Sequence, residues 1–179
     1  MCKPVSGWVT QDAVFWSKTT EAHTEIAAEY GLHIDGCRGA NAVAVECSPI
    51  DKDYRLPLDQ WVFRVDDAFP VPEWADMSEI EARFRVVLPD WLAAKVVLPG
   101  QKVDANQVTI LANYGVVAEN WAVVASNWGT VTENWGTVET YTTLPRSINA
   151  AGAVIIDRSG ATVKCYVGPG RKTKKQVEP

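Results

Sequence analysis

Hydrophobic and polar positions follow two different rhythms along this chain, one before residue 100 and one after it. The segment 4–17 holds two short runs in which apolar and polar positions alternate, 5–10 and 13–17, separated by Gln11 and Asp12. Such alternation places one face of a strand in a core, and the polar break between the runs fits a turn. The chain is therefore predicted to open with a β-hairpin.

The pattern then changes to a helical one. Between Glu21 and Tyr30 the apolar positions share one helical face, Thr20 is placed as an N-cap, and Gly31 stands where a C-terminal glycine belongs. These features predict a short amphipathic helix.

A second helix is predicted to begin at the capping box 78–81, where a serine hydroxyl and a glutamate carboxylate stand three residues apart. Pro89 removes a hydrogen bond and is expected to kink this helix or divide it in two. Strands are predicted at 42–47 and 60–65, on either side of a surface loop. Together these elements predict a small α+β domain over residues 1–100.

Five seven-residue repeats fill residues 107–141, with the sequences QVTILAN, YGVVAEN, WAVVASN, WGTVTEN and WGTVETY. A coiled coil needs two apolar positions per heptad on residues that favour helix, whereas these repeats are rich in Gly, Thr, Val and Asn. The repeats are therefore predicted to be short strands, each centred on a core valine, namely Val117, Val124, Val131 and Val138. The turns are placed at Asn113, Asn120, Asn127 and Asn134.

Two geometries suit such strands. In a β-solenoid, two or three repeats form one coil, so five repeats give about two coils, and identical residues stack upon one another. In an antiparallel meander the same strands are joined by Asn-x-Gly turns, and identical residues gain nothing. The solenoid is favoured. A closing hairpin with a turn at 157–160 is predicted to end the repeat region, 101–168, and the basic residues of 169–179 predict a flexible tail.

Composition narrows the class of protein. A hydrophobic fraction of 47% with eight tryptophans indicates an ordered chain, and a net charge of −5 argues against a nucleic-acid binder. No stretch approaches the roughly 20 apolar residues of a membrane span, and no apolar signal region follows Met1, so a cytoplasmic protein without membrane contact is expected. The four cysteines form no Cys-x-x-Cys pair and are expected to be free thiols. No cofactor-binding motif is present, so no cofactor is predicted.

One position of the repeat is aromatic, and it predicts a binding surface. It holds Tyr114, Trp121, Trp128 and Trp135. A row of exposed rings on a regular ladder is typical of a surface that contacts a sugar, a base or a protein. The alternative is that these rings cover the ladder against the first domain.

Cys2 carries the alternative, enzymatic interpretation. Removal of Met1 would leave a cysteine with its α-amine free, the arrangement of N-terminal-nucleophile amidohydrolases, with His23 as a candidate base. The opening Met-Cys resembles class II glutamine amidotransferases in those two residues, but Lys3 stands where that family has glycine. In the plainer interpretation Cys2 is a small apolar residue and His23 a hydrogen-bonded core residue.

Two sets of residues bear on metal binding. The set Cys2, His23, His33 and Cys37 has no known zinc-ligand spacing. The aspartates of the predicted loops also lack the spacing of a metal loop and are interpreted as solvated charge: Asp51, Asp53, Asp66 and Asp67. No metal site is predicted.

Short motifs throughout the chain resemble an uncharacterised family of small phage and metagenomic proteins, in which an N-terminal Met-Cys-Lys α+β domain precedes variable short repeats. The motifs are the opening 1–3, the segment 22–26, the stretch YRLPLDQWVFRV at 54–65, the Gly-Thr-Val repeats and the turn 157–160. The resemblance implies a phage setting and no particular chemistry. We expect a non-enzymatic accessory protein of the bacterial host cytosol that binds a host protein or a small ligand, with counter-defence as one role. An uncapped ladder end would also be an edge for homo-oligomerisation.

Overall fold

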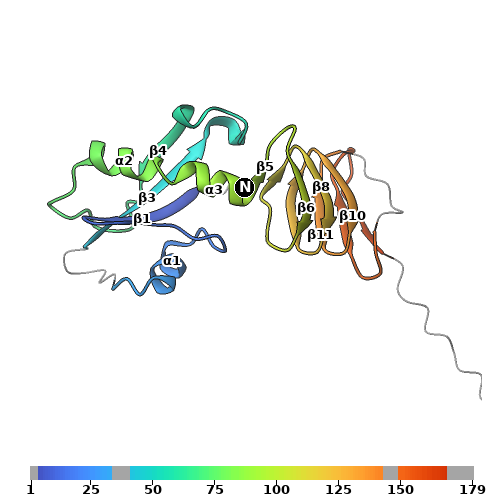
Figure 1. Ribbon diagram of the computed structural model, residues 1–179, viewed down its shortest axis with the longest axis horizontal. Helices are drawn as coiled ribbons and strands as arrows, with labels where there is room; N and C mark the ends of the chain where they lie inside the picture. The colour runs from blue at the N-terminus through green and yellow to red at the C-terminus, as the bar shows by residue number, and fades with distance from the viewer. Residues whose placement is uncertain (1–3, 34–40, 143–148, 169–179) are drawn as a thin grey trace, which may run out of the picture. The chain divides into compact units, whose positions relative to one another are not determined.

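The computed structural model describes residues 4–33, 41–142 and 149–168 (Figure 1). The chain divides into two compact units, Met1–Ala94 and Lys95–Pro179. The predicted α+β class with a β-solenoid is confirmed. The sequence predicted a boundary at residue 100, whereas the units divide after Ala94. The division is earlier because strand β5 (Val96–Val97) already pairs with strand β7 (Ala112–Asn113) of the second unit.

The first unit is built on a four-stranded antiparallel sheet in the order β2-β1-β3-β4. Its strands are β1 (Val5–Thr10), β2 (Val14–Phe15), β3 (Ala42–Pro49) and β4 (Trp61–Val65). The opening hairpin and both later strands are thus confirmed. The loop between β3 and β4 contains two single 3-10 turns, η1 (Ile50–Lys52) and η2 (Leu58–Gln60).

Helix α1 (His23–Glu29) packs on one face of this sheet, where Ile26 joins Trp8 and Ala44 in a buried cluster. The prediction of Thr20 as the N-cap is wrong. The N-cap is Ala22, which makes no side-chain hydrogen bond. The Thr20 hydroxyl accepts a hydrogen bond from the backbone N–H of Ala22. Gly31 adopts the predicted left-handed conformation, with φ of 65°.

Helix α2 (Met77–Arg85) packs on the opposite face, as Figure 1 shows. Gly7 makes this approach feasible, because a Cβ atom there would lie 2.6 Å from the Phe84 ring. Asp76, not the serine of the predicted capping box, is the N-cap, and its carboxylate accepts from two backbone amides. The chain breaks into a separate helix α3 (Leu88–Lys95), with Pro89 in its first turn, where a missing N–H costs nothing.

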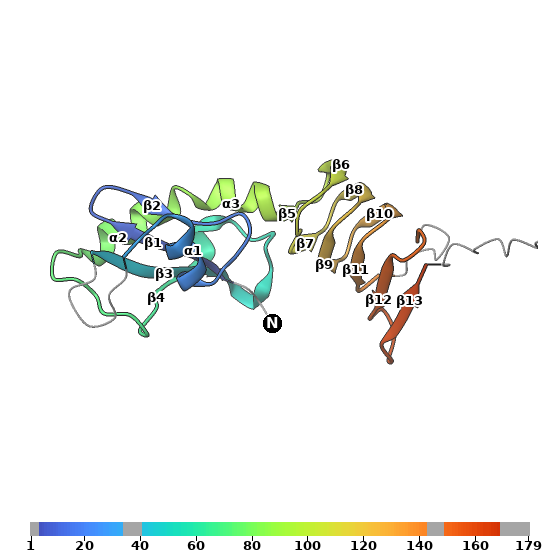
Figure 2. The same cartoon turned by 90° about the horizontal axis from the view of Figure 1, so that it is seen from below.

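The second unit is a β-solenoid with two parallel sheets, seen edge-on as successive coils in Figure 2. One sheet has the order β10-β8-β6, formed by Thr130–Asn134, Val116–Asn120 and Lys102–Asn106. The other continues from β5 through β7 (Ala112–Asn113), β9 (Val123–Asn127), β11 (Thr137–Thr140) and β12 (Val154–Asp157). Strand β13 (Lys164–Val167) pairs antiparallel with β12 and confirms the closing hairpin.

Two repeats make one coil. Val131 pairs with Val117 in one sheet and Val138 with Val124 in the other, so neighbours in space are fourteen residues apart in the chain. The solenoid has about four coils rather than the two expected, because residues on both sides of the repeats continue the same sheets. The prediction missed this because those flanking segments lack the aromatic and glycine signature of the repeats.

The interior of the solenoid is a stack of small identical side chains. The four predicted core valines are all buried, together with Val97 and Ile110. Close stacking of the coils leaves no room for a side chain at Gly136: a Cβ atom there would lie 1.9 Å from the Ala122 carbonyl oxygen. Glycine at position 136 is therefore a steric requirement of coil stacking, although the preceding coil carries Ala122 at the equivalent place of the repeat.

Candidate functional site

Two ladders of buried asparagine hold the corners of the solenoid. In one, Asn106 donates to Asn120 at 2.7 Å and Asn120 donates to Asn134 at 2.9 Å. In the other, Asn113 donates to Asn127 at 2.6 Å. Because these amides are fully enclosed and bond to one another, they stabilise the coil stacking and are not available to a ligand.

The predicted aromatic row is in fact two columns, one at each corner, because successive repeats alternate between the corners. Trp121 stacks on Trp135 with ring centroids 4.8 Å apart and planes 5° apart. In the other column Trp128 lies between Tyr114 and Tyr141, at 5.2 Å and 4.9 Å. The expectation of a single row is therefore wrong. Tyr141 is an additional member that the seven-residue frame misses, because the frame points to Thr142 and the register shifts between Val138 and Thr140.

The rings of both columns are well exposed at their edges. Trp121, Trp128, Trp135 and Tyr141 keep between 39% and 50% of their surface accessible. Trp128 is stacked on both faces, and each of the other four rings is stacked on one face by its neighbour in the column.

Acidic side chains accompany the rings. The Trp121 indole N–H donates to Glu119 at 3.0 Å, and the Tyr141 hydroxyl donates to Glu139 at 3.1 Å. Partial burial, and then the bond to Glu139, raise the pKa of Tyr141. The five repeats contain three glutamates and no lysine or arginine, so this part of the solenoid is locally negative.

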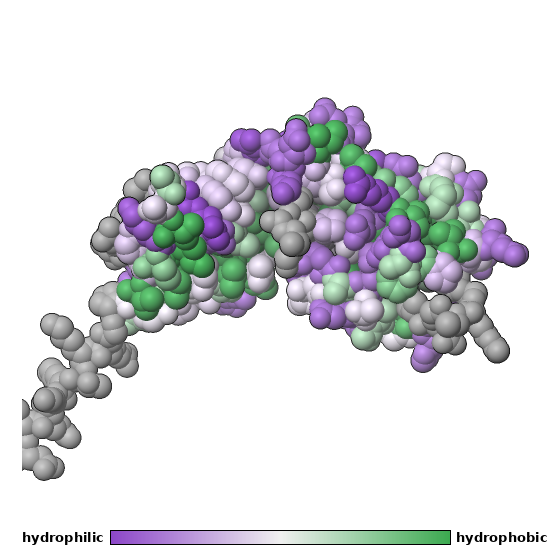
Figure 3. Space-filling view, turned by 180° about the vertical axis from the view of Figure 1, so that it is seen from behind, coloured by the Kyte–Doolittle hydropathy of each residue, from purple (hydrophilic) through white to green (hydrophobic). Residues whose placement is uncertain are grey.

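The two sheets of the solenoid present different outer faces. On the six-stranded sheet, Val123, Thr137, Val154 and Val167 lie in register across four strands and alternate with buried residues, so they point outward as one row. Figure 3 shows apolar side chains gathered on this face of the solenoid. We call this row the valine face.

The three-stranded sheet is polar on its outer side. Its outward residues include Thr130, Thr132, Glu119 and Glu133, all exposed. A lysine and an aspartate of β6, Lys102 and Asp104, form an ion pair at 2.6 Å there. The solenoid thus has one apolar and one hydrophilic face, with an aromatic column at each corner between them.

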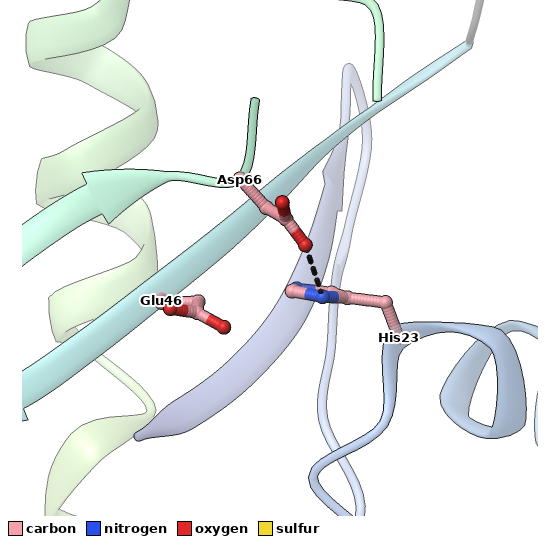
Figure 4. A group of neighbouring side chains, drawn as sticks. All are labelled: His23, Glu46 and Asp66. Atoms are coloured by element: carbon pink, nitrogen blue, oxygen red, sulfur yellow. Dashed lines mark ion pairs between the residues drawn. The ribbon is translucent and has the colours of Figure 1, made fainter. Parts of the chain in front are cut away.

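A separate cluster of polar side chains lies in the first unit. His23, Glu46 and Asp66 bring one ligand atom each to within 4.8 Å of one another, and they are the one such group among the described residues (Figure 4). His23 is buried as the sequence indicated, with Nδ1 3.0 Å from an Asp66 oxygen and Nε2 3.1 Å from the Val45 carbonyl oxygen.

The remaining sequence-predicted site residues give no second site. Cys2 lies outside the described residues, as does Cys37, so the amidohydrolase alternative stays a prediction. His33 is exposed and does not belong to the His23 cluster. Cys47 and Cys165 are free thiols; Cys47 is fully buried, and burial raises its pKa to about 11.

Sequence reasoning missed Glu46 and Asp66 as partners of His23. Glu46 is the one charged residue of a strand that is mostly buried, a local signal that could have singled it out. Asp66 follows a strand and was interpreted as solvated loop charge. Nothing in the spacing of these three residues indicates that the fold brings them together.

Within the described parts of the chain, no helix has both the length and the apolar character needed to cross a membrane. Comparison with known proteins found no matching family model, no matching curated protein and no matching solved structure.

Proposed function

We propose that this protein is a non-enzymatic binding protein, of phage type, whose solenoid engages a protein of the bacterial host through the valine face and the two aromatic columns. The observation that carries this proposal is the asymmetry of the solenoid. One outer face is an apolar row bordered by exposed Trp and Tyr edges, and the opposite face is hydrophilic.

Protein interfaces combine an apolar centre with aromatic residues and a polar rim. The valine face supplies the centre, Trp121 and Trp128 belong to the columns on its two sides, and Glu139 with its ion-pair partner Arg158 supplies polar groups at the edge. Large, rigid rings contribute contact area at low entropic cost. The glutamates of the repeats favour a partner surface that carries lysine or arginine beside apolar groups.

A protein partner fits the geometry better than a small planar ligand. A sugar or base binds an aromatic residue by stacking on its face. Here the faces within each column are already stacked at 4.8 to 5.2 Å, which leaves only the end rings open. The exposed edges instead suit the many shallow contacts of a protein surface.

A matched pair of substitutions tests this proposal. Val154→Lys places a charge on the valine face, while Thr130→Lys places the same charge on the hydrophilic face. We expect the unmodified chain and Thr130→Lys to retain the same host protein from a bacterial lysate and Val154→Lys to lose it. Circular dichroism should be unchanged in all three. The same loss is expected when Trp121 and Trp128 are replaced by alanine.

Retention of the same protein by Val154→Lys, or no specific retention by the unmodified chain, would contradict the proposal. Self-association through the valine face is a distinct outcome and would appear in size-exclusion chromatography as a dimer that Val154→Lys dissociates. Loss of the circular-dichroism signal in the tryptophan variants would show that the rings serve the fold instead.

A further inference from the structure

The cluster of His23, Glu46 and Asp66 has features that its role in packing does not explain. We propose that it binds a divalent transition-metal ion of the zinc type, with His23 Nδ1 and one oxygen each of Glu46 and Asp66 as ligands. This inference concerns the first unit and is independent of the function proposed for the solenoid. Figure 4 shows the three side chains converging from α1, β3 and the end of β4.

The imidazole ring of His23 is oriented as in a metal ligand. A backbone carbonyl only accepts hydrogen bonds, so the contact with Val45 O at 3.1 Å places a proton on Nε2. Nδ1 is then the nitrogen that faces Asp66 at 3.0 Å. Metal-binding histidines commonly donate their other N–H to a backbone carbonyl, which fixes the tautomer and directs the free lone pair at the metal. A metal ion held between Nδ1 and the Asp66 oxygen would be bound by that lone pair.

The side chains of His23 and Asp66 are held in fixed orientations. The His23 ring lies edge-on to Trp8 and Phe69, with ring centroids 5.4 and 5.7 Å away. The Trp8 indole also donates to the His23 carbonyl oxygen at 2.8 Å, so both the backbone and the ring of this residue are fixed. Asp66 is oriented through its other oxygen, which accepts from the Ala68 backbone amide at 3.0 Å. Two of the three ligands are thus preorganised.

A buried hydroxyl on the strand next to Glu46 has no hydrogen-bond partner in the described part of the chain. Ser6 is 3% exposed, and its Oγ atom has no hydrogen-bond partner among the described residues. Ser6 lies directly opposite Glu46 in the β1–β3 register and on the same side of β1 as Trp8, which packs on His23. An orphaned buried hydroxyl costs about 1 to 3 kcal/mol. A bound ion, directly or through its water, would give it a partner.

Distances and charge agree with a zinc-type ion. Ligand atoms on one tetrahedral Zn²⁺ are about 3 to 3.5 Å apart, which the His23–Asp66 contact already satisfies. Glu46 is half-buried on a strand and has the rotamer freedom to close the remaining gap. One imidazole and two carboxylates balance a divalent charge and leave a coordination position open. Arg64, the strand neighbour of Glu46, is the nearby cation against which the ion would compete.

Titration of the full chain with Co²⁺ and Zn²⁺ tests this site. We expect one Co²⁺ per chain, visible absorption bands of a nitrogen–oxygen site without thiolate charge-transfer bands, and displacement by Zn²⁺. Glu46→Gln and Asp66→Asn should each weaken binding at least about 10-fold, the size of effect seen even for outer-shell partners of metal ligands. Asp67→Asn, beside the cluster but outside it, is the matched control and should bind as the unmodified chain does.

His23→Gln should abolish metal binding. Because His23 is buried, a circular-dichroism spectrum of this variant is needed to show that it still folds. If His23→Gln fails to fold, Glu46→Gln and Asp66→Asn still decide whether the cluster binds metal. Thiolate bands in the Co²⁺ complex, equal affinity in Glu46→Gln and the unmodified chain, or a dissociation constant above about 1 mM would each overturn the proposal.

Discussion

The two units of this protein reach a packed core by opposite routes. The first packs large, dissimilar side chains that meet once each, such as Trp8, Trp61 and Phe84, all buried. The second stacks the same few small residues at a fixed interval: valine inside, asparagine at the corners and glycine where backbones touch. In the first unit, the packing contacts join residues from elements far apart in the chain. In the second, the same contact between coils recurs every fourteen residues.

This difference determines where each unit is vulnerable. In a solenoid every coil contacts only its neighbours, so a change in a repeated position disturbs a local interface that no other element supports. In the first unit a surface or capping change leaves the shared core intact.

The largest effect is expected at the coil-stacking glycine. Gly136→Ala would force a methyl group to within 1.9 Å of the Ala122 carbonyl oxygen, and neither backbone can retreat without separating two coils. We expect a loss of about 3 kcal/mol or more in the free energy of unfolding, measured by urea denaturation. The control is Gly160→Ala, where the added methyl meets no atom within 4 Å. Equal stability of the two variants would refute the proposed steric role.

Removing one rung of the asparagine ladder should be the next most costly change. Asn120→Ala deletes the bonds to Asn106 and Asn134. It leaves the buried Asn106 NH2 group without the Asn120 acceptor, while Asn134 keeps its bonds to Asn149 and Gly136. The expected loss is about 2 to 4 kcal/mol. Asn106→Ala removes one ladder bond, that to Asn120, and should lower the free energy of unfolding clearly less in the same denaturation experiment. A larger loss in Asn106→Ala than in Asn120→Ala would contradict the stabilising role of a continuous ladder.

In the first unit, the buried thiol of Cys47 should make stability depend on alkaline pH. Its pKa is raised to about 11 by burial, while an unfolded cysteine ionises near 9, so the unfolded state is favoured as the pH rises between these values. The urea midpoint should fall as the pH rises from about 9 to about 11, and this part of the fall should vanish in Cys47→Ala. A thiol reagent should modify exposed Cys165 and spare Cys47. Rapid modification of Cys47 in the folded chain would count against its burial.

The smallest effect is expected at the cap of α2. The Asp76 carboxylate accepts hydrogen bonds from the Ser78 hydroxyl and from the Ser78 and Glu79 amides, which lower its pKa. Its contribution is present at neutral pH and is lost as the pH falls through that lowered value. Asp76→Asn should reduce the melting temperature slightly at neutral pH and not at acidic pH. A difference that persists in acid would show that the charge is not the source.

The sequence was most informative where one residue type recurs. The repeats predicted the buried valines, the asparagine corners and the strand-forming character of 107–141. They could do so because residues that stack on one another in successive coils recur at a fixed interval in the sequence. The coil length and the split of the rings into two columns did not follow, since a period of seven suits two or three repeats per coil equally well. In the first unit, hairpin and helices followed from local patterns, but the meeting of His23 with Glu46 and Asp66 depends on strand pairing between residues far apart, which a single sequence does not reveal.

The fourteen-residue coil is tested most directly by engineered cysteine pairs in a chain whose native cysteines are replaced. Val116 and Thr130 are register neighbours on the outside of one sheet, whereas Val123 and Thr130 lie on opposite sheets. Neighbouring strands are about 4.8 Å apart, within reach of a disulfide. We predict that mild oxidation joins cysteines at 116 and 130 quantitatively and leaves 123 and 130 as free thiols. Failure of 116 and 130 to join, or ready oxidation of 123 and 130, would contradict the coil of fourteen residues.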